Sequence, residues 1–132
     1  MSAARTEGAS AARAAVAWAA ALDVVLVLVF VLIGRASHDE ADTAAGIVTT
    51  AWPFLVGLVV GWAVMRAWRA PLALAWTGVG VWVATVVVGM LLRVVSGQGT
   101  ALSFVIVATI VLGVFLLGWR ALARLGRRGR RR

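Results

Sequence analysis

The chain has 132 residues, of which 63% are hydrophobic and 14% charged, and its mean hydropathy is +1.00. A soluble domain of this length cannot hide that much apolar surface from water, so the composition excludes an ordinary soluble globule and predicts lipid-facing segments. With no Cys and one His, disulfides, thiolate metal sites and multi-histidine metal sites are excluded as well, and no metal or other cofactor is expected.

Four apolar segments are each long enough to cross a hydrocarbon core of about 30 Å, which takes about 20 helical residues. They cover residues 14–33, 47–65, 72–92 and 101–119. Pro53 and Pro71 fall near the starts of the second and third segments, where a missing N–H costs little. Unpaired backbone groups are too costly in lipid for anything but helices here. We therefore predict an all-α polytopic membrane four-helix bundle over residues 14–120, with an N-terminal tail (1–13) and a basic C-terminal tail (121–132).

The first segment contains an acidic residue, Asp23. Counted from Ala14 at about 1.5 Å per residue, it lies roughly 13 Å into the helix, near the middle of the bilayer. A charge there costs about 2.5–3.5 kcal/mol, so the side chain should face other helices. Depth matching places Thr85 and Thr109 beside it as hydrogen-bond partners. Asp23, Thr85 and Thr109 form a candidate intramembrane polar site. Either the site is proton- or cation-coupled, or a neutral Asp23 holds neighbouring helices together through hydrogen bonds.

A second polar group follows the first segment. Arg35 and His38 lie at its end, and Arg93 lies at the corresponding end of the third segment. The two guanidinium groups predict an outer-face site for an anion or a lipid headgroup. The alternative is that both arginines are ordinary interfacial anchors that complement a helix dipole and reach toward lipid phosphate.

The arginines also predict the orientation in the membrane. The formal charge of +8 comes from Arg alone, because the chain has no Lys. Eleven of the 13 arginines fall on the side of the two termini, and only Arg35 and Arg93 fall on the other. The positive-inside rule then predicts that both termini are cytoplasmic. Because all-Arg usage with abundant Ala, Val and Gly is typical of GC-rich bacterial genomes, we expect a bacterial cytoplasmic membrane.

Small residues and a repeated spacing suggest how the helices pack. Gly57 and Gly61 are four residues apart, a spacing that allows close helix approach, more readily within the bundle than between protomers. The dipeptide Gly61-Trp62 recurs as Gly118-Trp119, and the interval from Trp18 to Arg35 recurs from Trp76 to Arg93. Either the two hairpins are duplicates, or Trp and Arg simply favour opposite interfaces a spanning length apart.

Several landmarks follow one another in a characteristic order along the chain. They are Asp23, Gly34-Arg35-Ala36-Ser37-His38, Pro53-Phe54, Gly61-Trp62, Pro71, Gly89-Met90-Leu91-Leu92-Arg93, Gly99-Thr100-Ala101-Leu102-Ser103-Phe104 and Gly118-Trp119-Arg120. In this order the sequence resembles domain of unknown function 3054, a family of small prokaryotic membrane proteins. The resemblance implies four spanning helices and implies no activity.

No nucleophile–base pair or metal-ligand set is recognisable, so we do not expect an enzyme. The leading hypothesis is a small proton- or ligand-handling, transporter-like bundle that uses Asp23. The alternative is an accessory or assembly subunit of a larger membrane complex. The expected partners are the lipid bilayer, with anionic lipids at the arginine tail, and either a second copy in a homodimer or another membrane protein. No nucleic-acid partner is expected, because the tail directly follows a membrane helix.

Overall fold

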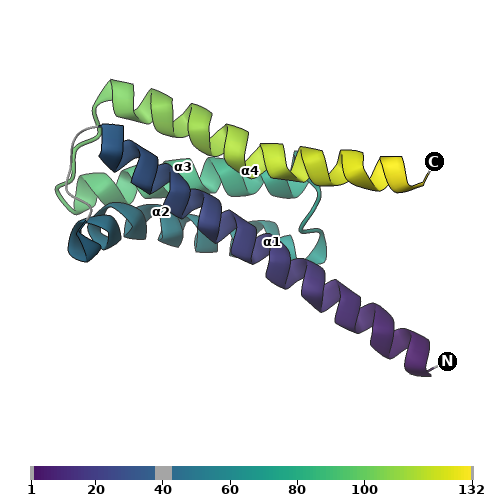
Figure 1. The fold of residues 1–132 in the computed structure, drawn as a ribbon. Coiled ribbons are helices and arrows are strands. Elements are labelled where there is room, and N and C mark those ends of the chain that lie inside the picture. The colour runs from purple at the N-terminus through teal and green to yellow at the C-terminus, as the bar shows by residue number, and fades with distance from the viewer. Residues whose placement is uncertain (1, 38–42, 132) are drawn as a thin grey trace.

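A computed structural model describes residues 2–37 and 43–131, and within these ranges the chain is helical and has no strand. The long helices are α1 (Ser2–Ser37), α2 (Ala44–Met65), α3 (Val79–Val95) and α4 (Leu102–Arg130). Two short helical elements lie between α2 and α3, the 3-10 turn η1 (Ala67–Arg69) and the π-helical segment η2 (Leu74–Gly78). Figure 1 shows the order of the four long helices.

Four helical stretches are long and apolar enough to cross a membrane, with η2 and α3 counted as one. This confirms the predicted all-α four-helix class. The second stretch begins three residues before its predicted span, and the third and fourth begin two and one residues after theirs. The terminal helices differ more, because α1 extends back to Ser2 and α4 continues to Arg130. The segments named as tails are therefore mostly helical extensions of the outer two spans.

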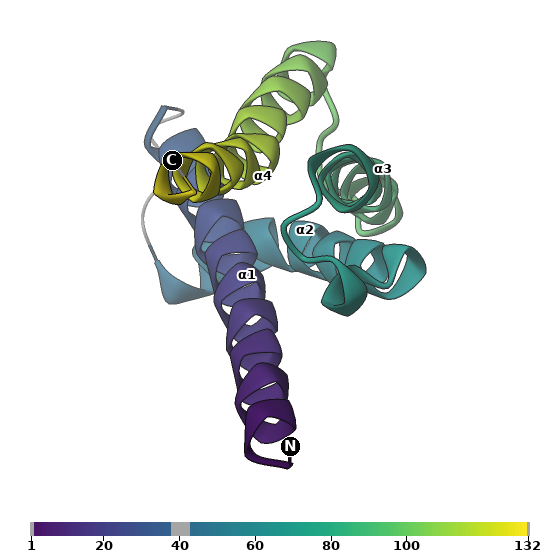
Figure 2. The same cartoon turned by 90° about the vertical axis from the view of Figure 1, so that its right-hand side faces the viewer.

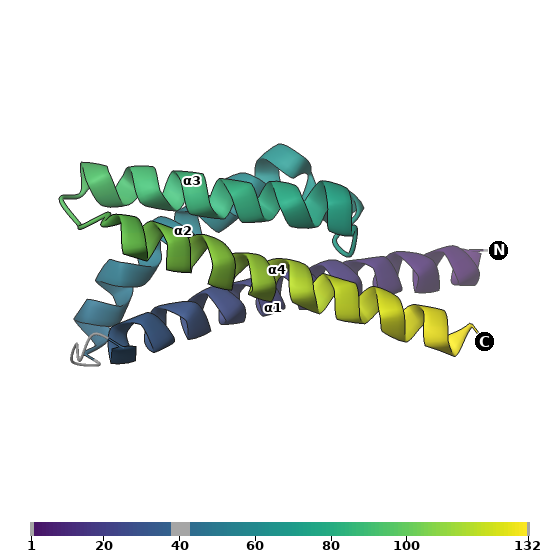
Figure 3. The same ribbon diagram turned by 90° about the horizontal axis from the view of Figure 1, so that it is seen from above.

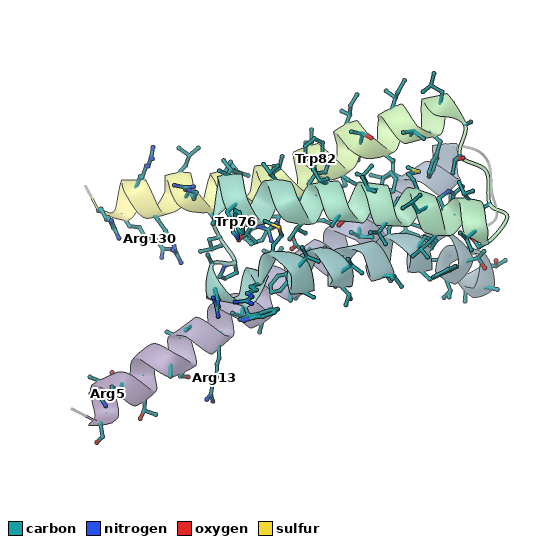
Figure 4. All side chains as sticks on the ribbon, turned by 180° about the vertical axis from the view of Figure 1, so that it is seen from behind. Arg5, Arg13, Trp76, Trp82 and Arg130 are labelled. Atoms are coloured by element: carbon teal, nitrogen blue, oxygen red, sulfur yellow. The ribbon has the colours of Figure 1, made fainter. Side chains whose placement is uncertain are left out.

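The bundle has two distinct ends. Both chain termini lie at one end, which we call the terminal end, together with the α2–α3 connection (Figures 1 and 3). The end of α1, the start of α2 and the α3–α4 connection lie at the other, which we call the loop end (Figure 3). α2 and α3 pack closely along their length, whereas α1 crosses the bundle obliquely and its N-terminal part projects away from the other helices (Figure 2). Figure 4 shows Arg5 and Arg13 on that projection and Arg130 near the far end of α4.

The core arises from side chains repeated every four residues along each helix, because positions i and i+4 share a face. On α4 this stripe begins at Ala108 and continues through Leu112 and Leu116. On α1 it contains Val27 and Val31, with Phe30 beside them. Large apolar side chains on the opposite faces, such as Val59 and Val114, are exposed in the isolated chain, as lipid-facing positions require.

Two glycines allow α2 and α3 to approach each other closely. Their four-residue spacing predicted such packing within the bundle. A Cβ atom added at Gly57 would lie 2.8 Å from the carbonyl oxygen of Thr85, and one added at Gly61 would lie 3.0 Å from the Cβ of Ala84. These two positions therefore belong to the α2–α3 interface. They do not present a free small-residue face to a partner protein.

Pro53 lies well inside α2 rather than near its start, because the helix begins at Ala44. A proline has no N–H, so the carbonyl of Thr49, four residues earlier, receives no hydrogen bond from it. The side chain of Gln98, in the α3–α4 connection, donates from Nε2 to that carbonyl at 3.0 Å. The loop thus replaces the missing backbone donor, which explains how an apolar segment accommodates an internal proline.

Candidate functional site

Asp23 lies completely buried at the meeting point of α1, α2 and α4. Its carboxylate accepts four hydrogen bonds. Arg120 donates from Nη1 to Oδ1 at 2.9 Å and from Nη2 to Oδ2 at 2.7 Å. The indole N–H of Trp62 donates to Oδ2 and that of Trp119 donates to Oδ1, each at 2.8 Å. Each carboxylate oxygen therefore accepts one bond from a guanidinium and one from an indole.

This geometry matches an ionised carboxylate. A protonated carboxyl carries an O–H that needs an acceptor, and all four of these partners are donors. The fork-to-fork pairing of a guanidinium with a carboxylate is the strong, directional form of this interaction. The two charges cancel inside the bundle, and the pair ties α1 to α4 while Trp62 ties in α2. The arrangement therefore holds these three helices together.

Arg120 is as deeply buried as Asp23, and its remaining contacts are with backbone. Its Nε donates to the carbonyl of Pro71 at 2.9 Å, and its Nη1 also donates to the carbonyl of Leu116 at 2.9 Å. A Cβ atom added at Gly78, in the π-helical segment, would lie 3.2 Å from the Cδ of Arg120. The glycine therefore leaves room for the arginine stem, and the α2–α3 connection is fastened to α4 through Pro71.

The predicted partners of Asp23 are not its partners. The hydroxyl of Thr85 donates to the carbonyl of Val81 at 2.7 Å, and that of Thr109 donates to the carbonyl of Val105 at 2.7 Å. Both side chains thus bond to their own helices. The prediction was wrong because it converted residue counts into depth, and α1 is inclined to the other helices (Figure 1). Asp23 lies level with Trp62, which is in the last turn of α2, and so is nearer the terminal end.

From the sequence, Arg120 was counted among the eleven arginines on the side of the termini and was not predicted to be the partner of Asp23. One signal was present. Arg120 continues the four-residue stripe of Ala108, Leu112 and Leu116, all of them fully buried. An arginine that extends an apolar face, in a chain with an intramembrane acid, is a candidate counter-ion. Trp62 and Trp119 carried a second signal as the recurring Gly-Trp dipeptides, and they bind opposite oxygens of the same carboxylate.

Arg35 and Arg93 line one cavity at the loop end, although they belong to α1 and α3. The cavity has a volume of about 480 Å³. Its lining residues are Phe30, Val31, Gly34, Arg35, Thr49, Thr50, Arg93, Gln98, Gly99, Ala101, Ser103 and Phe104. Apart from the two arginines these residues are neutral. We call this space the loop-end cavity.

Local contacts hold both guanidinium groups in place. Arg93 donates from Nε and Nη2 to the carbonyl of Gly99, at 2.9 and 2.7 Å, and from Nη1 to Oε1 of Gln98 at 2.9 Å. It also lies over the ring of Phe104, 4.3 Å from the centroid. Arg35 donates from Nη1 to the hydroxyl of Thr50 at 3.0 Å. Both arginines are therefore oriented by the cavity wall rather than extended into solvent.

The base of the loop-end cavity is aromatic. Phe30 and Phe104 line it, with ring centroids 6.4 Å apart, and Phe54 packs edge-on against Phe30 at 5.3 Å. The cavity thus combines two cations with an apolar base. His38, the third residue of the predicted outer-face site, lies outside the described residues. Within the described ranges no group of three His, Asp or Glu side chains is placed to hold a metal ion.

Comparison with known proteins yields one family. No significant match exists among curated proteins or solved structures. Several of the residues that carry the resemblance lie at the two places described above: Asp23, Trp62, Pro71, Trp119 and Arg120 in the buried cluster, and Arg35, Arg93, Gly99 and Phe104 at the loop-end cavity. The model of the family described as "Protein of unknown function (DUF3054)" matches residues 20–123, which is most of the chain, and the protein therefore belongs to the DUF3054 family.

Proposed function

We propose that this protein is a ligand-binding bundle of the bacterial cytoplasmic membrane that takes an amphiphilic anion, a carboxylate or phosphate with an apolar body, into the loop-end cavity. The binding involves no chemical conversion. Arg35 and Arg93 bind the charged group, and the aromatic base receives the apolar part. This proposal keeps the ligand-handling half of the leading hypothesis and moves the site from Asp23 to the other end of the bundle.

The observation that carries the proposal is the convergence of Arg35 and Arg93 on one cavity from two helices that are not adjacent in the chain. A guanidinium presents a planar fork of N–H donors that fits a carboxylate or phosphate, so two of them on one wall suit an anionic group. A cavity of about 480 Å³ falls within the usual range for small-molecule sites, which are mostly apolar with a few placed polar groups.

Asp23 is assigned a structural part in this proposal. All four donors around its carboxylate come from the protein itself, so a ligand would have to displace one of them. Apolar residues fill the bundle between the loop-end cavity and the buried ion pair, among them Val27, Phe54 and Leu112. Binding at one end, rather than passage through the bundle, is the activity that this packing supports.

The arginine distribution supports the orientation within the proposal. With Arg120 assigned to the interior, ten arginines remain on the side of the termini and two at the loop end. The positive-inside rule then places the termini in the cytoplasm and the loop-end cavity on the outer face. The ligand would therefore come from the periplasmic or extracellular side, or from the outer leaflet.

Three probes test separately how the charge and the apolar body of the ligand contribute to binding. Inorganic phosphate offers charge alone, hexanol an apolar body alone, and hexanoate both. The purified protein is reconstituted in nanodiscs of neutral lipid, and its unfolding temperature is followed by the fluorescence of its seven Trp residues. We expect hexanoate to raise the unfolding temperature more than either other probe, because only a ligand that binds the native state stabilises it. Equal responses to hexanoate and hexanol would contradict the proposal.

Substitutions test whether the hexanoate response arises at the loop-end cavity. Arg35→Gln and Arg93→Gln should each remove the hexanoate response, whereas Arg130→Gln, which removes the same charge at the terminal end, should preserve it. Arg93→Lys keeps the charge but loses the planar fork, so an intermediate response is expected. Neutralising Asp39, Glu40 and Asp42, which lie outside the described residues, tests whether loop acids compete for the cavity. Stronger hexanoate binding in that variant is the expected result.

The accessory-subunit hypothesis stays a prediction. An assembly role would need small-residue faces that are free to pack against a partner helix. Gly57 and Gly61 face α3, and Gly113 faces Trp82, where an added Cβ would lie 3.1 Å from the indole. The described contacts therefore use these faces inside the bundle, and no observation here favours an assembly role over ligand binding.

A further inference from the structure

A second charged cavity lies at the terminal end, between the N-terminal half of α1, the α2–α3 connection and the last turns of α4. Its volume is about 560 Å³. Its lining residues are Ala12, Ala15, Trp68, Arg69, Ala70, Pro71, Leu72, Ala73, Arg124, Arg127, Arg128 and Arg131. Five of these twelve are arginines and none is acidic. We call this space the arginine cavity.

An apolar groove runs beside the arginine cavity, on the lipid-facing surface between α1 and α2. It has a volume of about 330 Å³, and its lining side chains are aliphatic or aromatic. Its lining residues are Ala20, Val24, Leu58, Val59, Trp62, Ala63 and Trp68. Trp68 lines both the groove and the arginine cavity, so the two spaces meet at this residue.

We propose that the arginine cavity and this groove together form a specific binding site for one anionic phospholipid. The phosphate headgroup occupies the arginine cavity, and an acyl chain follows the groove. Trp68 lies at the boundary between them, where an amphipathic indole is favoured between water and hydrocarbon. The site is distinct from the loop-end cavity and lies at the opposite end of the bundle.

The chemistry of the two spaces identifies a lipid rather than a soluble anion. Clustered arginines bind phosphate through charge and paired N–H donors, and they face an anionic leaflet at this end of the helices. A free phosphate would need only the arginine cavity and would leave the groove to bulk lipid. Four of the five arginines, Arg124, Arg127, Arg128 and Arg131, lie beyond residue 123, the last residue of the family match.

The test compares two triple variants that remove the same charge. The first combines Arg124→Gln, Arg127→Gln and Arg128→Gln, inside the cavity. The second combines Arg5→Gln, Arg13→Gln and Arg130→Gln, which do not line it. Native mass spectrometry of the delipidated protein, titrated with phosphatidylglycerol, measures the affinity for one lipid. We expect the first variant to lose about tenfold or more in affinity and the second to lose much less.

A second pair of variants tests the groove without changing charge. Ala63→Phe fills the groove, and Ala17→Phe adds the same ring to an exposed α1 position that does not line it. We expect Ala63→Phe to weaken phosphatidylglycerol binding severalfold and Ala17→Phe to leave it unchanged. Circular dichroism and size-exclusion chromatography verify that each variant is folded before it is compared.

Three outcomes would overturn the proposal. Equal losses in the two arginine variants would show diffuse attraction to an anionic surface and no built site. Unchanged binding in Ala63→Phe would remove the acyl chain from the site. Displacement of bound phosphatidylglycerol by inorganic phosphate or glycerol 3-phosphate at comparable concentration would identify a soluble anion as the ligand.

Discussion

Asp23 and Arg120 lie 97 residues apart in the chain and form a two-pronged ion pair inside the bundle, with N–O distances of 2.9 and 2.7 Å. Both side chains are fully buried, so neither charge has water to solvate it. The energetic consequence is asymmetric. Removing one partner leaves an isolated charge in the interior, whereas removing both leaves a neutral, poorly packed space.

That asymmetry gives the first prediction. Asp23→Leu should destabilise the bundle by about 3–5 kcal/mol, because Arg120 is left buried without its counter-ion. The double variant Asp23→Leu with Arg120→Met should recover most of this loss. Unfolding in mixed micelles of increasing denaturing-detergent content measures both. If the double variant is no more stable than the single one, the pair is not the main interaction of either residue.

The two indoles give the second prediction. Trp62→Phe and Trp119→Phe keep an aromatic ring but remove the N–H that donates to the carboxylate. Each should cost about 1.5–3 kcal/mol, the usual value for a hydrogen bond to a charged group. Trp18→Phe is the matched control, because Trp18 is 71% exposed and its replacement should change stability by less than about 0.5 kcal/mol. The same detergent unfolding assay applies.

Pro53 and Gln98 give the third prediction, as a double-mutant cycle. Gln98→Leu removes both the donor to the Thr49 carbonyl and an acceptor for Arg93, and the loss of the donor alone should cost about 0.5–1.5 kcal/mol. In a Pro53→Ala background, residue 53 has its own N–H for that carbonyl, so the same Gln98→Leu change should cost less. The coupling energy is obtained from four unfolding measurements. Additive effects would show that the amide does not compensate for the proline.

Gly57 gives the fourth prediction. Gly57→Ala places a methyl group 2.8 Å from the backbone carbonyl of Thr85, which cannot move without shifting α3. A loss of about 1–3 kcal/mol is expected from this overpacking. Gly118→Ala has nothing within 4 Å and should be neutral or stabilising by up to about 1 kcal/mol, through helix propensity alone. Similar losses at both positions would argue against close α2–α3 packing.

The orientation gives the fifth prediction, and the chain is well suited to test it because it contains no Cys. Ser2→Cys and Arg130→Cys should react in intact cells only with a membrane-permeant maleimide. Asp39→Cys should react with an impermeant reagent added outside. Labelling of position 39 only after the membrane is opened would reverse the proposed topology and place the loop-end cavity in the cytoplasm.

The sequence alone determined that the protein is helical and spans a membrane, and it determined roughly where each span lies. Length and hydropathy demanded helices that cross a membrane, and they did so locally, because each span contains about 20 apolar residues in succession. The need of Asp23 for a partner also followed from the sequence, since a lone charge in an apolar span is costly. For Arg35 and Arg93, at matching ends of two spans, the sequence left two alternatives open, a shared anion site and separate interfacial anchors.

Only the tertiary structure decided which residues meet. Thr85 and Thr109 matched Asp23 in counted depth, yet Trp62, Trp119 and Arg120 are the side chains that contact it. The difference is physical. Depth along one helix follows from the rise per residue, whereas contact between helices depends on their inclination, stagger and rotation. Those quantities are set by how α1 crosses α2 and α4, through packing of the whole bundle, and no single segment contains that information.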